Sequence, residues 1–387
     1  MSAPMFAPPT GRPPRAVAAL LAVFALALAP SADAQGGGVR PDQVFRFMPR
    51  TGTVTKLIGT VKENSLTRVR VELADKEQDI DSADVRRIVW GDVPNTFRDG
   101  LAFADRGDWE NAVQRFRAAA GDQETRAVVR AAARHEAAEA LLRWGSDDPN
   151  RFSECAGECE VFLADHPDDR GVPRARWLQA RATWLSGDAA KASALFQALY
   201  DEGSGDTATP GYDRTRCLEA GLQAARSALE ASDTSTARTL FSALQTAFGQ
   251  ASAAAGDDAE LRARLDRFAG EAEVGEGFCL LAGGQAGQAQ SFFEGRLRGA
   301  RDAGTRFAST LGLAEAYRAG GDLRRAQIQF ATVSALDYSD RDRRAQALVG
   351  LADVTVQLGG AGATAEAQVW LDEVKELYGD TPAASRL

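Results

Sequence analysis

The sequence has 387 residues, of which 44% are hydrophobic and 26% charged, and its formal net charge at pH 7 is −9. This composition allows a globular core, and the acidic balance argues against binding to nucleic acid or to an anionic membrane surface. Only two histidines and four cysteines are present. They leave few ligands for a metal site.

The first 34 residues have the pattern of a secretory signal peptide. Arg12 and Arg15 precede an apolar run over residues 16–29, and Ala32 and Ala34 are small residues of the kind that a signal peptidase requires. The run is short for a transmembrane helix, although an uncleaved membrane anchor is the alternative. We expect cleavage after Ala34, export to the periplasm or the medium, and no stable membrane insertion after cleavage.

A flexible spacer follows over residues 35–41, and residues 42–92 are then rich in alternating and β-branched segments. Strands are expected at residues 44–47, 53–61, 67–73 and 88–90, turns at 62–65 and 74–77, and a helical turn at 82–85. Short strands with a helical turn before the last one resemble the small SH3-like and Sm-like barrels. We expect this module to cap the first helix pair, because residues 91–94 leave almost no linker. A separate binding module is the alternative.

From residue 95 onward, Ala-rich amphipathic runs alternate with breaks, and one arrangement recurs. Gly107 and Asp108 are followed by Ala112 and Phe116, which lie one helical turn apart on one face. The same pair of small and large residues recurs at positions 192 and 196, 237 and 241, 289 and 293, and 326 and 330, with weaker copies at 155 and 159 and at 367 and 371. The repetition predicts an array of helix pairs in which Asp caps the second helix and the Ala and Phe side chains fill the seam.

These residues resemble the tetratricopeptide repeat (TPR) family over about residues 95–380. The best matches are Gly100, Phe103, Gly107, Ala112, Phe116 and Ala119, and then Tyr317, Gly321, Ala326 and Phe330. The resemblance implies a mainly α fold, a superhelix of antiparallel helix hairpins whose first helices line a concave, ligand-binding groove, without enzymatic activity. The long loop at residues 203–211 is expected to divide the array into a first stack, residues 95–202, and a second, residues 212–380.

The sequence contains no recognisable catalytic or metal-binding pattern, so we expect no catalytic residues, no metal and no cofactor. Cys155 and Cys159 share one helix face, where their nearly parallel side chains suit a disulfide poorly, and we interpret them as small seam residues. Whether Cys217 and Cys279 meet is left open. An unrecognised cell-wall or peptide hydrolase is an alternative function.

A cluster of aromatic and charged residues on the first helices is the candidate partner-binding site. It consists of His135, Glu139, Arg143, Trp177, Arg181, Trp184 and Arg226. In a groove, the tryptophans would offer rigid apolar area, and Arg181 would bind a carboxylate of the partner while contributing little to folding. The alternative is that Trp177 and Trp184 are core residues.

We therefore predict a non-enzymatic, exported scaffold or adaptor that binds a protein or peptide partner in its groove. An envelope protein is one candidate partner, and cell-envelope assembly or coordination is the expected process. A self-assembling structural repeat protein is a further alternative. The sequence does not decide the oligomeric state.

Overall fold

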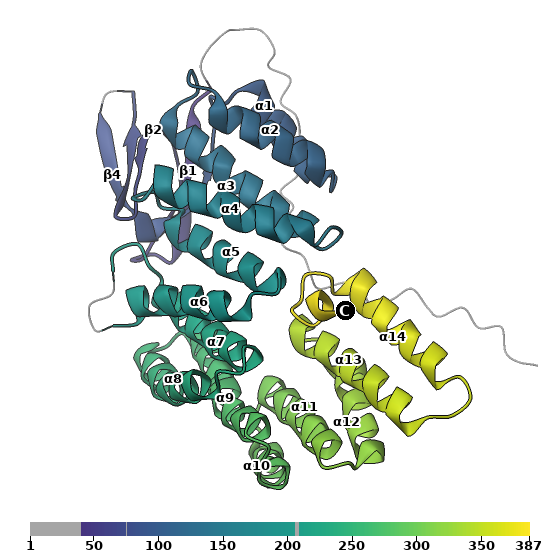
Figure 1. Ribbon diagram of the computed structural model, residues 1–387. Coiled ribbons are helices and arrows are strands. Elements are labelled where there is room, and N and C mark those ends of the chain that lie inside the picture. The colour runs from purple at the N-terminus through teal and green to yellow at the C-terminus, as the bar shows by residue number, and fades with distance from the viewer. Residues whose placement is uncertain (1–39, 75, 206–208) are drawn as a thin grey trace, which may run out of the picture. The chain divides into compact units, whose positions relative to one another are not determined.

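The computed structural model describes residues 40–387, except residue 75 and residues 206–208. The predicted signal peptide and most of the predicted spacer lie outside the described residues. The described chain begins with a small β-sheet and continues as helices (Figure 1).

In the described part of the chain, fourteen helices form seven consecutive antiparallel pairs, from α1 with α2 to α13 with α14 (Figure 1). Their bounds are α1 Asn95–Ala104, α2 Trp109–Gly121, α3 Ala127–Trp144, α4 Asn150–Asp165, α5 Val172–Leu185, α6 Ala189–Ser204, α7 Arg214–Glu230, α8 Thr234–Ala254, α9 Ala259–Ala282, α10 Ala286–Gly299, α11 Ala303–Ala319, α12 Leu323–Leu336, α13 Arg341–Leu358 and α14 Ala363–Leu377. Each helix packs on the next, and first helices of neighbouring pairs also touch, as α7 does α9. The predicted mainly α, TPR-like fold of helix hairpins is confirmed.

The turns inside the pairs have the predicted chemistry. Gly107, Gly187 and Gly321 have φ angles of 75°, 95° and 81°, a left-handed conformation that glycine adopts without steric cost. The aspartates that follow them cap the next helix, as Asp188 does by accepting a hydrogen bond from the backbone N–H of Lys191 at 2.9 Å. The sequence thus ends one helix and starts the next at each of these turns.

The recurring small and large residues form the seams between helices. Ala112, Ala192 and Ala326 are fully buried, and so are Phe196 and Phe330. Some of the rings need a glycine on the facing helix. A Cβ atom at Gly312 would lie 2.2 Å from Phe293, and one at Gly350 would lie 2.4 Å from Phe330. Ring and glycine together let the helices approach closely.

The loop between α6 and α7 is not accompanied by a break in the packing. Phe196 on α6 and Leu218 on α7 belong to the same buried cluster, which continues to Phe241 on α8. The division of the array into two stacks at this loop stays a prediction, and the two helices beside the loop share one core.

The N-terminal module is a five-stranded antiparallel sheet with the strand order β4-β3-β2-β1-β5. Its strands are β1 Asp42–Met48, β2 Thr53–Asn64, β3 Arg68–Glu72, β4 Glu77–Asp81 and β5 Val85–Val89. The first half of β2 pairs with β1 and its second half with β3. The expected helical turn is present at Ser82–Asp84. Among the described residues, no pairing joins β4 to β5, so these strands are the two edges of the sheet.

Two expected turns are partly strand. Residues 62–64 belong to β2, and β4 begins at Glu77, within the turn expected at 74–77. The charged residues that suggested turns lie on the exposed face of the sheet, where they pair across strands. Lys62 Nζ lies 2.8 Å from Glu72 Oε2, and Glu77 Oε2 lies 3.7 Å from Arg70 Nε. Ion pairs between neighbouring strands stabilise a sheet, so charged residues occur in strands as well as in turns. The charged composition of these two segments therefore predicted turns where the structure has strands.

The module lies along the side of the array and contacts its second, third and fourth helix pairs. That it caps the first pair stays a prediction. Arg126, just before α3, binds both carboxylate oxygens of buried Asp42 at 2.8 Å. Farther along the array, the N–H of Leu66 donates to the carbonyl of Asp168 at 2.8 Å, and Gly211 packs against Leu66. The sheet therefore touches the segments that precede α3, α5 and α7, in three successive pairs.

The C-terminal residues contact the first half of the array. Arg181 on α5 binds both carboxylate oxygens of Asp342 on α13, at 3.0 and 3.1 Å, and the carbonyl of Asp380 at 2.7 Å. A Cβ atom at Gly379 would lie 2.5 Å from the carbonyl oxygen of Ser146, in the turn after α3. These contacts join segments more than 160 residues apart in the sequence.

Candidate functional site

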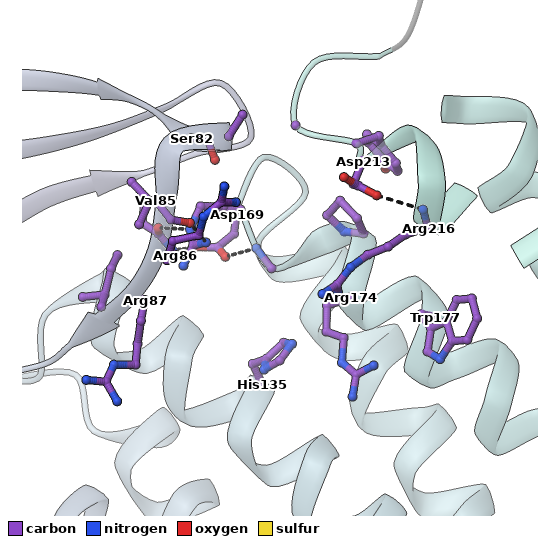
Figure 2. Close-up of a pocket in the computed structure, with 18 of the residues that line it drawn as sticks. Ser82, Val85, Arg86, Arg87, His135, Asp169, Arg174, Trp177, Asp213 and Arg216 are labelled. Atoms are coloured by element: carbon purple, nitrogen blue, oxygen red, sulfur yellow. Dashed lines mark hydrogen bonds between the residues drawn. The ribbon is translucent and has the colours of Figure 1, made fainter. Parts of the chain in front are cut away.

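A cleft with a volume of about 920 Å³ lies between β5 and the helices α3, α5 and α7. Figure 2 shows β5 on one side, with Arg86 and Arg87, and Arg174, Trp177 and Arg216 on the other. This volume is at the upper end of the range of about 300–1,000 Å³ typical of small-ligand sites. The docking of the sheet onto the array creates the cleft.

The junction that holds β5 beside α5 is built from polar residues. Arg170 donates to the side chain of Asn64 at 3.1 Å and to the carbonyl of Val85 at 3.3 Å. The carboxylate of Asp169 accepts hydrogen bonds from Asn64 at 3.1 Å and from the N–H of Gly171 at 2.7 Å. These bonds fix one end of β5 at the entrance to α5.

The cleft is basic although the whole chain is acidic. Seven arginines line it, namely Arg86, Arg87, Arg170, Arg174, Arg214, Arg216 and Arg264. Four carboxyl groups line it, namely Glu136, Asp169, Asp213 and Glu219. With all carboxyl groups ionised, the lining still has three positive charges in excess, which attracts anionic groups.

Several of these arginines have no carboxylate partner among the described residues. Arg174 is paired with Glu139 at 2.7 Å, and Arg264 with Glu219 at 2.7 Å. In contrast, Arg86, Arg87 and Arg216 are exposed and form no ion pair within the described chain. Such guanidinium groups are available to a carboxylate from outside.

Arg86 and Arg87 are oriented by aromatic rings. A bulge in the pairing of β1 with β5 lies beside these two residues. Their guanidinium carbons lie 4.6 Å from the ring centroids of Phe47 and Phe45, respectively. Contacts of this kind hold the positive charges in place at little cost in solvation.

Two titratable side chains of α3 line the cleft side by side. The Nε2 atom of His135 is buried and has no hydrogen-bond partner among the described residues, and burial lowers the pKa of this histidine. Burial, with a smaller effect from the charge of Glu139, raises the pKa of Glu136 to about 7. At pH 7 Glu136 is therefore about half protonated, which makes the cleft more positive than its residue count suggests.

Aromatic side chains give the cleft apolar surface. Trp90, Trp177 and Tyr212 all line it. Trp177 is half-buried and packs edge-on against Phe196, with ring centroids 5.3 Å apart. The cleft thus combines arginine with rigid aromatic surface, which is the composition of many protein-binding sites.

The structure separates the residues of the predicted groove site. His135 and Trp177 line the cleft, and Glu139 is next to it through its pair with Arg174. Arg143 lies exposed near the end of α3. That these residues bind a partner stays a prediction.

The other three residues of the predicted site make contacts within the chain. Trp184 is buried, and its indole N–H donates to Glu230 at 3.0 Å. Arg181 binds Asp342, and Arg226 binds Glu271 at 2.8 Å. The burial of Trp184 fits the alternative that this tryptophan is a core residue.

Arg226 belongs to a buried group of charges that joins α7, α9 and α13. Arg343 is 5% exposed, and its Nε lies 2.5 Å from Asp337 and its Nη1 3.8 Å from Glu271. Burial raises the pKa of Glu271, although Arg226 and Arg343 act in the opposite direction. Because removing one member would leave a buried charge unpaired, we interpret this group as structural.

No cluster of candidate metal ligands occurs among residues 40–387 outside the gaps at 75 and 206–208. The four cysteines are buried and free, and Cys155 donates a weak hydrogen bond to the carbonyl of Ala138 at 3.2 Å. The interpretation of Cys155 and Cys159 as seam residues fits their complete burial. None of the described helices is long and apolar enough to span a membrane.

The arginines that line the cleft were not among the site residues predicted from the sequence. Arg86 and Arg87 look like ordinary exposed residues of a strand, and Arg214 and Arg216 like the first turn of a helix. The sequence marks each of these pairs only by two arginines that stand close together in a chain that is acidic overall. The sequence does not reveal that the two pairs lie on opposite sides of one cleft.

Comparisons with known proteins find only distant similarities, all of them to solved structures. No family model matches the sequence, and no curated protein matches it. A tetratricopeptide repeat protein from Parabacteroides merdae is 14% identical with a TM-score of 0.48, over 73% of this chain and 92% of that one. NprR, solved in complex with its cognate peptide NprX, is 12% identical with a TM-score of 0.43, over 74% and 80%. The apo form of RapI is 8% identical with a TM-score of 0.36, over 72% and 74%.

These structures are only distantly similar to the chain. Its architecture follows from its own geometry. Helix pairs alternate with turns at glycine and aspartate, and the seams are built from alanine and phenylalanine. The described chain is a TPR-like helical-repeat protein with a five-stranded antiparallel sheet at its N-terminal end.

Proposed function

We propose that this protein is a non-enzymatic scaffold that binds an acidic segment of a protein partner in the cleft between β5 and the helices α3, α5 and α7. The observation that carries the proposal is the excess of arginine there, seven against four carboxyl groups, in a chain with a net charge of −9. Arginine binds carboxylates through two parallel hydrogen bonds, and the neighbouring tryptophans add apolar contact area.

The proposal moves the partner site from the groove predicted from the sequence to the cleft beside the sheet. His135 and Trp177 belong to both, whereas Arg181 and Arg226 already have carboxylate partners within the chain. A partner that displaced Asp342 from Arg181 would exchange one carboxylate for another, with little net gain. The cleft offers arginines that need no such exchange.

We also propose that the protein acts outside the cytoplasm, in cell-envelope assembly or coordination. The support for this part is the signal-like pattern of the first 34 residues, with its apolar run and small residues at 32 and 34. An exported scaffold would meet its partner in the periplasm or at the cell surface.

The binding proposal can be tested with a synthetic acidic peptide. The probe is an acetylated eight-residue peptide of alternating Asp and Val with a C-terminal fluorophore, and binding is measured by fluorescence anisotropy. We expect Arg86→Glu and Arg216→Glu each to weaken binding about tenfold, which corresponds to about 1.4 kcal/mol per lost contact.

Arg306→Glu is the matched control, because Arg306 is an exposed arginine on α11 and does not line the cleft. It makes the same change in net charge and should leave the affinity within about twofold. Equal losses of affinity in all three variants would show that probe binding depends on the net charge of the protein and not on the arginines of the cleft. No binding of the probe to the unmodified protein would contradict the proposal.

A further inference from the structure

The strand β5 is an edge of the sheet, and it lies at the cleft. It pairs with β1 on one side, and it has no strand partner on its other side among the described residues. An unpaired edge presents a row of backbone N–H and C=O groups that can bind another extended chain. Proteins usually cover such an edge or prevent it from pairing. An uncovered edge beside a cleft is therefore a candidate site for an added strand.

The cleft meets β5 along this edge. Val85, Arg86, Arg87 and Ile88 all line it, although they do not share one face of the sheet. Val85 and Ile88 pack with the core of the module, whereas Arg86 and Arg87 lie against Phe47 and Phe45. A cavity that touches residues from both faces of a strand must lie beside the strand and not above it. Figure 2 shows the opposite wall, formed by α3, α5 and α7.

Two features indicate what could occupy this space. Two of the exposed side chains of β5, Arg86 and Arg87, are cationic and have no carboxylate partner within the described chain, so an acidic strand complements them. On the floor of the cleft, the buried Nε2 atom of His135 lacks a hydrogen-bond partner among the described residues. Because this atom is shielded from solvent, the imidazole ring would have to turn toward the cleft before a peptide group could satisfy it.

We infer that the partner segment binds as an added β-strand, extended along the free edge of β5, with its acidic side chains toward the arginines of the cleft. The inference rests on the proposed function and specifies the conformation and the backbone chemistry of the partner. Backbone hydrogen bonds to β5 would supply affinity, and the arginines would supply the preference for acidic sequences. The N–H of Val85 donates to the carbonyl of Ser82, and the carbonyl of Val85 accepts a hydrogen bond from Arg170. The remaining four residues of β5 span about 14 Å, so about four residues of the partner would pair.

Backbone methylation of the probe tests this inference without altering the protein. In an added strand, alternate N–H groups face the sheet and the others face away. Two versions of the Asp/Val probe are therefore made, one N-methylated at the Asp residues and one at the Val residues. We expect one version to lose at least tenfold in affinity, while the other binds within about twofold of the unmethylated probe.

The outcomes separate the two proposals. If the unmethylated probe binds and both methylated versions bind equally well, or both lose affinity alike, strand addition is wrong while the acidic-peptide proposal stands. If the unmethylated probe does not bind, the proposed function itself fails. Tight binding of inorganic phosphate that displaces the probe would identify a small-anion site and overturn strand addition. Dimerisation of the protein that the probe reverses would assign the edge to a second copy of the chain, and would also overturn it.

A second measurement locates the binding. Hydrogen exchange of the backbone amides is compared with and without the unmethylated probe. Slower exchange in residues 85–89, on an edge that is unpaired in the structure, is the result expected for strand addition. Protection confined to the helices, with unchanged exchange in β5, would contradict it.

Discussion

Replacing Arg181 with alanine should destabilise the fold. The guanidinium group binds both carboxylate oxygens of Asp342 and the carbonyl of Asp380, and the two side chains are only 18% and 21% exposed. Breaking a fully buried pair costs about 3–5 kcal/mol, whereas an exposed pair contributes about 0–1 kcal/mol. For this partly exposed pair we expect a loss of about 2–3 kcal/mol in the free energy of unfolding.

A double-mutant cycle measures the interaction itself. Arg181→Ala, Asp342→Ala and the double variant are compared by urea unfolding followed by circular dichroism. We expect a coupling energy of about 1–3 kcal/mol, because the residues are in direct contact. Arg143→Ala is the control, since Arg143 is exposed near the end of α3, and it should change stability by less than about 0.5 kcal/mol.

Hydrogen exchange shows where the stability is lost. Because Arg181 joins α5 to α13, Arg181→Ala should speed exchange in α13 and in the C-terminal residues more than in the sheet. The reasoning would be refuted by an Arg181→Ala variant as stable as the unmodified protein. If that variant also lost the acidic probe while Arg86→Glu retained it, the groove predicted from the sequence would be the binding site.

Three further predictions concern other parts of the chain. Glu136→Gln should raise the free energy of unfolding by about 1–3 kcal/mol above pH 7 and by little near pH 4.5. Urea unfolding of both proteins at several pH values measures this difference. The reason is that a pKa raised from 4.5 to about 7 by burial makes the native stability fall as pH rises through that window. Phe330→Ala should cost about 3–5 kcal/mol, because the ring is fully buried against Gly350, and hydrogen exchange should rise more in α11–α14 than in residues 42–89. N-terminal sequencing of the exported protein should begin at Gln35, and a start at Met1 or Ser2 would contradict cleavage.

The helical array follows from local sequence signals. A glycine that permits a left-handed turn, an aspartate that caps a helix, and a small and a large residue one helical turn apart all act within a few residues of each other. At Gly187, Asp188, Ala192 and Phe196 the structure has the turn, the cap and the buried pair as expected. Repetition then gives the architecture, since each pair can bury its apolar face only against its neighbours.

The cleft and the C-terminal contacts could not be predicted in the same way. They depend on how distant segments meet, as Asp42 meets Arg126 and Arg181 meets Asp342, and no periodic pattern records such pairs. Charged residues are normally exposed, so a buried arginine such as Arg343 is not expected from composition. Likewise, Arg86 acquires its significance only because the sheet docks along the side of the array.

Inversion of charge specificity is the most direct test of the central claim that the cleft binds an acidic segment. Arg86 and Arg216 are replaced together by glutamate, and the affinities of the unmodified protein and of this variant are measured for the Asp/Val probe and for the same probe with Lys in place of Asp. The account predicts that the acidic probe binds the unmodified protein at least tenfold more tightly than the variant, and that the basic probe prefers the variant by a similar factor. Unchanged preferences in a variant whose circular dichroism and unfolding match those of the unmodified protein would contradict the account.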